Sequence, residues 1–370
     1  MSFLQTLSQI ERHISLNGHG FAYNLAAGLQ KWRATLAKIK SGTTDIYDVV
    51  CLGDSITSGF YCDPSPPTNY FTKGFACLLR AGLANLLGDV GYGFVPSWFP
   101  NANYKFATYT GAWTYFNAPT APNICGYFIY SLTAGDTISI PFNGTTFGLM
   151  VRRGEEDGQF TIKIDSGDPV TIDLYQDTTE AHIYEVTGFG AGDHTALITV
   201  DNAAHPSRAI CVLGFTAKKG TVGIRVNTCG RGGAKASDAS TTYALGAEIN
   251  QFSPVLTIVA FGTTDYWAQV SLADFQNYLQ LIITRVKTYG DCLLVALGTS
   301  STVCTIPQSA YTGVTKQIAL ANNCAFVSVN DRWVSNSNAN ALGYVYDGTH
   351  PNAAGHQDIG TYLLQCLGVE

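Results

Sequence analysis

An almost unbroken apolar run, Val255–Phe261, decides the fold class of this chain. A strand with one solvent-facing side alternates apolar and polar residues, so a continuous run indicates a strand covered on both faces, as in a parallel sheet. Similar runs alternate along the chain with stretches of helical periodicity: strands are expected over 46–52, 292–297 and 325–329, and helices over 271–289, 308–322 and 352–367. Strands that alternate with helices predict an α/β domain built on a parallel sheet.

The middle of the chain follows a different pattern. Over 91–220 the helical periodicity disappears, and short alternating runs such as Thr137–Ile140 and Ala196–Val200 are separated by Gly, Asn and Asp turns. Short strands with such turns between them predict an antiparallel β-sandwich. We therefore expect an inserted sandwich domain that splits one α/β domain into 46–90 and 221–370.

Helices are expected on either side of the first strand. Residues 1–45 are predicted to be helical, and their apolar stripe comprises Leu25, Leu29, Trp32, Leu36 and Ile39. A helix over 68–88 is predicted to bury Phe71, Phe75, Leu78, Leu79, Leu83 and Leu86. The N-terminal segment could pack on the α/β domain or attach the chain to a larger assembly, and the sequence leaves both open.

Composition narrows the classes of partner. With 46% hydrophobic and 13% charged residues, the chain can bury a large core. A net charge of −6 without a basic block argues against nucleic acid and against docking on anionic lipid. No apolar stretch approaches the ~20 residues that span a bilayer. Met1–Gln5 lacks the start of a secretory signal, so we expect synthesis in the cytoplasm without a signal peptide, unless one was removed, and no membrane insertion.

The ten cysteines raise the question of disulfides. There is no Cys-x-x-Cys pair, and five of the cysteines sit inside apolar runs, namely Cys51, Cys77, Cys211, Cys292 and Cys366. We therefore expect buried free thiols that act as small apolar side chains. A reducing cytosol would suit such thiols.

A serine stands where the first buried strand ends. Gly53-Asp54-Ser55 follows the run 46–52, and reactive groups in open parallel sheets gather at the carboxyl ends of strands. Gly53 allows the chain to turn sharply at this point. Ser55 could instead cap the segment that follows, as Ser and Asp commonly do.

Near the C-terminus, His350 has a carboxylate three residues earlier in the loop Asp347-Gly348-Thr349-His350. Asp347 could accept a hydrogen bond from Nδ1 of His350, which would leave Nε2 free to take the Ser55 proton. These residues predict a Ser-His-Asp nucleophilic site and hence a hydrolase. The alternative is an Asp-Gly turn with an incidental surface histidine. His356 falls within the last helix and is expected to be a packing or capping residue.

Two further segments follow apolar runs. Gly230-Arg231-Gly232-Gly233 could present backbone N–H groups to an anion, or could be a flexible return from the insertion. It lacks the G-x-G-x-x-G spacing of a dinucleotide site. Gly262-Thr263-Thr264-Asp265 closes the run 255–261 and could line the site or form a simple turn capped by Asp265. Trp267 could then stack on a sugar ring or pack in the core.

Taken together, the four segments resemble the blocks of SGNH, or GDSL, hydrolases, which have a flavodoxin-like parallel sheet. The resemblance implies Ser55 as nucleophile, with Asp347 and His350 completing the triad. It implies oxyanion donors from the backbone of Ser55, from the Gly233 N–H and from Thr264. Thr264 stands where the family pattern Gly-x-Asn-Asp has asparagine. The resemblance implies no metal and no organic cofactor.

Threonine in place of asparagine at position 264 is expected to lower the reaction rate, because losing one oxyanion donor typically costs ~10²–10³ in kcat. A threonine hydroxyl donates one hydrogen bond with a shorter reach, and we expect Thr264 to substitute in part. Asp54, Arg231 and Trp267 are expected to contact the substrate.

The insertion is similar to the jelly-roll domains attached to carbohydrate O-acetylesterases of this type. The turn Gly188–His194 and the strand after it carry this resemblance. A helical leader, this insertion and the lack of a signal peptide together resemble phage tail-associated esterases. The resemblance implies a serine esterase that removes small acyl groups, acetyl first, from a bacterial surface polysaccharide. It also implies that the insertion binds carbohydrate and that the N-terminal segment joins a virion or surface assembly.

Two alternatives stay open. One is a lipid esterase or thioesterase of the same fold. The other is a glycan-binding adhesin or receptor-binding protein with a weak or vestigial esterase site, which the replacement at Thr264 suggests.

Overall fold

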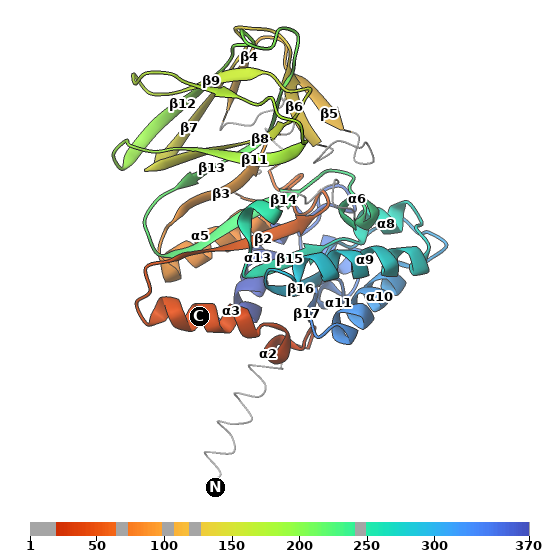
Figure 1. The fold of residues 1–370 in the computed structure, drawn as a ribbon. Helices are drawn as coiled ribbons and strands as arrows, with labels where there is room; N and C mark the ends of the chain where they lie inside the picture. The colour runs from red at the N-terminus through yellow and green to blue at the C-terminus, as the bar shows by residue number, and fades with distance from the viewer. Residues whose placement is uncertain (1–19, 64–72, 98–106, 118–126, 241–248, 370) are drawn as a thin grey trace.

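The computed structural model describes residues 20–63, 73–97, 107–117, 127–240 and 249–369 (Figure 1). Two parts are visible in Figure 1: an α/β domain below and a β-sandwich above it. The two parts are joined where strand β3 of the sandwich lies near β14 of the α/β domain.

The α/β domain is built on a six-stranded sheet in the order β1-β17-β16-β15-β2-β14. Its strands are β1 (Ala22–Tyr23), β2 (Ile46–Gly53), β14 (Gly223–Gly230), β15 (Leu256–Ala260), β16 (Asp291–Ala296) and β17 (Ala325–Ser328). All neighbouring pairs are parallel except β1 with β17. Counted along the chain, the parallel strands stand in the order 2-1-3-4-5, which is the flavodoxin-like arrangement. The predicted fold class is confirmed.

Helices cover both faces of this sheet, as the continuous apolar runs predict. Alternate residues of β2 enter opposite cores: Val49 and Cys51 face one cluster, whereas Val50 and Leu52 face the other. The first cluster includes residues of α3 (Gln30–Lys40), α5 (Phe75–Leu87) and α13 (Ala353–Leu367). The second includes residues of α9 (Leu272–Val286) and α10 (Gln308–Ala321). Because both faces are buried, a polar residue has no solvent-facing position in the middle of β2.

Shorter helices connect these elements. They are α2 (Leu25–Gly28), α6 (Ala236–Ser240), α7 (Ile249–Phe252), α8 (Thr263–Trp267), α11 (Val329–Trp333) and α12 (Asn336–Ala341). The start of α9 is capped, since the Ser271 hydroxyl oxygen accepts from the Asp274 N–H at 3.1 Å. Within the described residues, no helix is long and apolar enough to cross a membrane.

The N-terminal segment packs on the α/β domain over its described part. Its apolar stripe is buried, but the predicted single helix is wrong, because Ala22–Tyr23 form a strand and Leu29 separates α2 from α3. The chain leaves helical geometry at Leu29 (φ −125°, ψ 38°), next to Gly28, where a Cβ would lie 2.3 Å from the backbone nitrogen of Ala325 at the start of β17. Residues 1–19 of this segment lie outside the described residues, and attachment to a larger assembly stays a prediction.

The helix predicted over 68–88 begins at Phe75 within the described residues, and Phe71 lies outside them. Its buried stripe follows the i, i+4 spacing through Phe75, Leu79, Leu83 and Leu87. Leu86 was predicted to lie on the buried side, which is wrong: it is 52% exposed, because it lies off that stripe.

The insertion consists of two antiparallel sheets, in the orders β10-β9-β12-β7-β4 and β11-β8-β13-β6-β5, with β3 added beside β13. The strands are β3 (Gly91–Pro96), β4 (Thr108–Thr110), β5 (Thr114–Asn117), β6 (Tyr127–Ser131), β7 (Thr137–Gly144), β8 (Thr146–Arg153), β9 (Gln159–Ile164), β10 (Val170–Asp173), β11 (Glu180–Val186), β12 (Gly192–Val200) and β13 (Ile210–Lys218). A separate apolar cluster fills the space between the sheets. The predicted sandwich is therefore present, and a jelly-roll connectivity stays a prediction.

Strand pairing explains how the sandwich fits inside another domain. Its first strand pairs with its last, with Gly91 opposite Lys218, so the chain enters and leaves the insertion side by side. Strand β14 then returns directly to the edge of the parallel sheet next to β2. The nine cysteines in the described part of the chain are all free, and seven of them are buried.

Candidate active site

Ser55 lies directly after β2, at the carboxyl edge of the parallel sheet. The strand order reverses at β2, because the chain continues to β14 on one side and to β15 on the other, and such switch points open a crevice for ligands. Gly53 is required there: a Cβ would lie 2.2 Å from the Thr57 Oγ1 and 2.4 Å from the Ala260 carbonyl oxygen. The tight approach turns the chain and places Ser55 at the cavity described below.

His350 and Asp347 lie in the loop before α13. The Asp347 carboxylate accepts three hydrogen bonds: from His350 Nδ1 at 2.8 Å, from the His350 backbone N–H at 2.8 Å and from the Thr349 N–H at 3.1 Å. Partial burial opposes ionisation of Asp347, but the hydrogen bonds from His350 and Thr349 outweigh it and hold its pKa below the ordinary value. The carboxylate is therefore ionised at neutral pH and fixes the imidazole.

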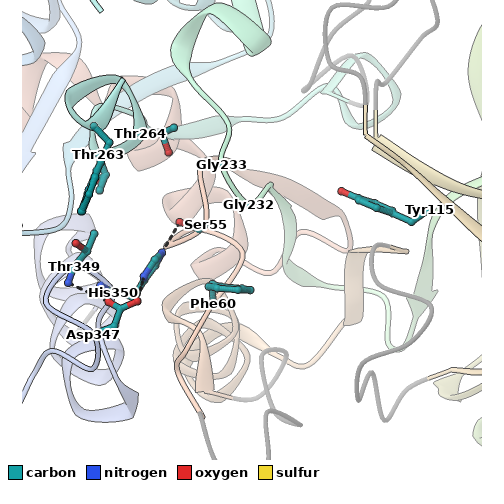
Figure 2. A pocket seen from close by; sticks show the side chains of 11 residues that line it. Ser55, Phe60, Tyr115, Gly232, Gly233, Thr263, Thr264, Asp347, Thr349 and His350 are labelled. Carbon is teal, nitrogen blue, oxygen red and sulfur yellow. Dashed lines mark hydrogen bonds and ion pairs between the residues drawn. The ribbon is translucent and has the colours of Figure 1, made fainter. Parts of the chain in front are cut away.

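The three residues form one hydrogen-bonded chain (Figure 2). Ser55 Oγ lies 2.9 Å from His350 Nε2, although the two residues are 295 positions apart. Because an ionised carboxylate only accepts, Nδ1 of His350 carries its proton toward Asp347, and Nε2 of the neutral ring is left as an acceptor. That nitrogen faces the Ser55 hydroxyl. The structure thus brings together the three residues that the sequence singled out, and their catalytic roles stay predictions.

A cavity of about 520 Å³ opens in front of this chain of bonds. Its described lining comprises Ser55, Phe60, Tyr115, Gly232, Gly233, Thr263, Thr264, Trp267, Asp347, Thr349 and His350. The predicted substrate contact Trp267 is at the cavity and is 45% exposed. Phe60 packs its ring against His350, with centroids 5.4 Å apart.

The two predicted oxyanion donors beyond Ser55 also line the cavity. Gly233 has φ +74°, and nothing lies within 4 Å of where its Cβ would be. Backbone conformation, and not space, therefore requires glycine at this position. Thr264 belongs to α8, whereas its neighbour Thr263 turns inward and donates its hydroxyl to the Leu297 carbonyl oxygen at 2.8 Å. Figure 2 shows Thr264, Gly233 and Ser55 around the same opening.

Two of the predicted substrate contacts are wrong. Asp54 is 1% exposed, and its carboxylate accepts from the Ile56 N–H at 3.0 Å. Arg231 is fully buried; it donates to the Gly230 carbonyl oxygen at 3.0 Å and its guanidinium lies over the Phe94 ring. Neither residue lines the cavity. We expected the side chains of Asp54 and Arg231 to face the cavity, but both point into the protein.

Two buried carboxyl groups, those of Asp54 and Asp265, lie next to the segments that line the cavity. Burial raises the pKa of Asp54 to about 7, against backbone hydrogen bonds from Ile56 and Thr264 that favour the ionised form. Burial also raises the pKa of Asp265 to about 7, and the charge of Asp54 adds to this effect. Asp265 accepts from the Ala236 N–H at 3.1 Å, so it ties α6 to α8 and does not cap its own turn. These bonds join the cavity segments to one another.

His356 has the role that its place in the last helix suggested. It is fully buried, and its Nδ1 accepts from the Phe75 N–H at 3.1 Å, which closes the start of α5. Burial lowers the pKa of His356 to about 3, so the ring is neutral at physiological pH. Within the described residues, no group of three or more His, Cys, Asp or Glu side chains is arranged to hold a metal ion.

Sequence reasoning missed several lining residues. Thr349 lies inside the predicted loop, and Phe60 follows the Gly53-Asp54-Ser55 turn closely, so their proximity could have indicated them. Tyr115 comes from β5 of the insertion, and no local pattern in the sequence marks it as part of the site.

Comparison with known families now adds independent information. Residues 190–357 match the model of the GDSL-like Lipase/Acylhydrolase family. The match covers less than half of the chain; it includes Gly233, Thr264, Asp347 and His350, and it begins after Ser55, which lies on the other side of the insertion. No curated protein matches the sequence.

Among solved structures, one described as "Peptidoglycan O-acetylesterase in action, 5 min" covers 92% of this chain and 96% of its own, with a TM-score of 0.67 and 16% identity. An active-site mutant of a family two carbohydrate esterase from Clostridium thermocellum covers 70% of this chain and 100% of its own, with a TM-score of 0.31 and 13% identity. A catalytic mutant of an acetylxylan esterase from Geobacillus stearothermophilus covers 40% of this chain and 74% of its own, with a TM-score of 0.33 and 22% identity. The first likeness shows a shared fold; the other two are too partial to carry an argument.

The family match and the shared fold confirm the resemblance to SGNH/GDSL hydrolases. A serine, a histidine and an aspartate are hydrogen-bonded in that order at the expected edge of the sheet, which is the arrangement that nucleophilic acyl transfer requires.

Proposed function

We propose that this protein is a serine esterase that removes small acyl groups, acetyl first, from an O-acylated polysaccharide. The observation that carries the proposal is the unbroken relay from Asp347 through His350 to Ser55 at the wall of an open cavity. A serine hydroxyl is a weak nucleophile until a neighbouring base takes its proton, and this arrangement supplies that base.

The first half of the proposed reaction acylates the enzyme. His350 Nε2 takes the Ser55 proton while Ser55 Oγ forms a bond to the ester carbonyl carbon. Asp347 keeps the proton on Nδ1 and stabilises the imidazolium that forms. The tetrahedral intermediate then collapses, the bond to the sugar oxygen breaks, and His350 gives its proton to that oxygen. The products are a deacylated sugar and an acyl group on Ser55.

The second half repeats the steps with water. His350 removes a proton from a water molecule, whose oxygen attacks the acyl carbon. The bond to Ser55 Oγ breaks, His350 returns the proton to Ser55, and the carboxylic acid leaves. All the proton transfers use this chain's own residues.

Negative charge on the carbonyl oxygen is proposed to be held by three donors: the backbone N–H groups of Ser55 and Gly233 and the Thr264 hydroxyl. Their support is that all three residues line the same cavity and that Gly233 adopts a backbone conformation, φ +74°, that L-residues rarely adopt. Such donors are worth most where water is excluded and where they need no reorganisation.

A carbohydrate substrate is favoured by the character of the cavity. Trp267, Tyr115 and Phe60 offer flat rings beside the nucleophile, and flat rings suit the C–H faces of sugars. The solved structure that shares this fold is described as a peptidoglycan O-acetylesterase. For this chain we propose only the broader substrate class, an acylated glycan. Three further parts of the proposal are a bacterial surface polysaccharide as substrate, carbohydrate binding by the insertion, and association of the N-terminal segment with a virion or surface assembly.

Release of acetate from a panel of O-acetylated polysaccharides tests the function, with Ser55→Ala as the control protein. The proposal expects acetate from at least one polymer with the wild type and none above background with the variant. A second series of p-nitrophenyl esters, from acetate to octanoate, tests chain length. A preference for octanoate would point to a lipid esterase, and equal release by Ser55→Ala would end the proposal.

A further inference from the structure

One residue of the cavity wall comes from the inserted sandwich. Ten of the eleven described lining residues belong to the α/β domain, and the remaining one is Tyr115 of β5. Strand β5 lies at the edge of its sheet and pairs with β6, where Tyr115 stands opposite Ile129. In Figure 2 the Tyr115 ring points from this strand toward the two segments that carry Ser55 and Gly232. The insertion is therefore part of the site and not a remote attachment.

Tyr115 is firmly held at the junction of the two domains. Its side chain packs against the apolar cluster of the sandwich and also against a cluster of the α/β domain. Its neighbour Phe116 stacks on Phe128 with ring centroids 4.7 Å apart. At the opposite edge of this sheet, a hydrogen bond from Gln251 Nε2 of α7 to the Ala181 carbonyl oxygen of β11, 2.9 Å long, also ties the two domains together. A ring held from both sides is preorganised to receive a ligand.

The phenol carries no charge when the enzyme works. Burial raises the pKa of Tyr115 to about 12, and the nearby Arg231 guanidinium offsets only part of this effect. Tyr115 thus brings an uncharged aromatic ring to the wall of the cavity. Such a ring packs against the C–H face of a pyranose ring and has no equivalent use for a small ester without a ring.

On these grounds we propose that Tyr115 of the insertion is a specificity-determining residue, whose ring packs against the sugar that carries the acyl group. This inference rests on the proposed esterase function. It makes the insertion a wall of the catalytic cavity that selects sugar esters over simple ones.

The test compares kcat/KM for glucose pentaacetate with kcat/KM for ethyl acetate, both followed by acid release in a pH-stat. Tyr115→Ala is expected to lower the ratio of the two values about tenfold, because the aromatic contact is lost only for the sugar ester. Tyr115→Phe, which keeps the ring, is expected to leave the ratio within about twofold of the wild type. Tyr115→Leu keeps apolar volume without a flat ring and is expected to behave like Tyr115→Ala.

Tyr175→Ala is the matched control, because Tyr175 is a 45% exposed tyrosine of the same insertion that does not line the cavity. It should leave both kcat/KM values unchanged. The inference is overturned if the ratio is unchanged in Tyr115→Ala and Tyr115→Leu. It is also overturned if Tyr115→Phe lowers the ratio as much as Tyr115→Ala does, because the effect would then belong to the phenol hydroxyl. Failure of the proposed function has a different outcome: wild type releases no acid from either ester, or Ser55→Ala retains the activity.

Discussion

Replacing Asp347 by asparagine should keep the shape of the loop but change which nitrogen of His350 carries the proton. In the native loop, Oδ1 of Asp347 accepts from the backbone N–H groups of Thr349 and His350, and Oδ2 accepts from His350 Nδ1. In Asp347→Asn the amide oxygen can keep both backbone bonds, so the loop should retain its shape. The amide nitrogen then faces His350 Nδ1 and can only donate to it.

The consequence is a change of tautomer. A ring that accepts at Nδ1 carries its proton on Nε2, and Nε2 then donates toward Ser55 Oγ, 2.9 Å away, and cannot take its proton. The same exchange in a Ser-His-Asp triad lowers kcat by about 10⁴, which corresponds to about 5.5 kcal/mol of transition-state stabilisation. We expect a loss of about 10⁴ in kcat for p-nitrophenyl acetate and little change in the melting temperature.

The assay is steady-state hydrolysis of p-nitrophenyl acetate together with a thermal melt. Asp331→Asn is the control for the chemical change, because Asp331 is exposed in α11 and does not line the cavity. It should retain wild-type kcat. If Asp347→Asn folds normally and keeps kcat within about tenfold of the wild type, the proposed tautomer argument is wrong.

Three further substitutions have defined outcomes. Thr264→Val should lower kcat about 10²-fold with KM little changed, because it removes one oxyanion donor, and an unaltered kcat would remove Thr264 from that role. Gly233→Ala forces an L-residue to φ +74° and should cost about 1–2 kcal/mol in the free energy of unfolding by urea, with a loss of kcat as its N–H moves. The pKa of the Asp54 carboxyl is raised from 3.8 to about 7 in the folded protein. Between these values the folded state keeps a proton that the unfolded state releases, so the stability that protonated Asp54 contributes is lost as pH rises from about 4 to 7. Asp54→Asn should remove that loss, at most about 4 kcal/mol, and a pH–stability curve parallel to that of the wild type would contradict this assignment.

The parts of the site that the sequence revealed are those set by local requirements. Gly53 must lack a side chain because the Ala260 carbonyl oxygen lies where a Cβ would be, and Ser55 follows it by two positions. Asp347 and His350 bond within one short loop, so their spacing alone suggests the pair. The continuous run in β15 is explained in the same way, since helices cover both of its faces.

The features that escaped prediction depend on packing between distant segments. Asp54 and Arg231 lie beside true lining residues, yet they turn inward, and a motif does not tell which side of a turn faces the cavity. Tyr115 reaches the site because the sandwich packs against the α/β domain. The strand Ala22–Tyr23 exists because β17 offers it a free edge.

The measurement that addresses the central claim most directly is covalent labelling of the nucleophile with diisopropyl fluorophosphate, followed by peptide mass spectrometry. The account predicts one adduct per chain, on the peptide that contains Ser55, with no label in Ser55→Ala and greatly slowed labelling in His350→Ala. Esterase activity that survives without any label on Ser55, or equal labelling of another residue in Ser55→Ala, would contradict it.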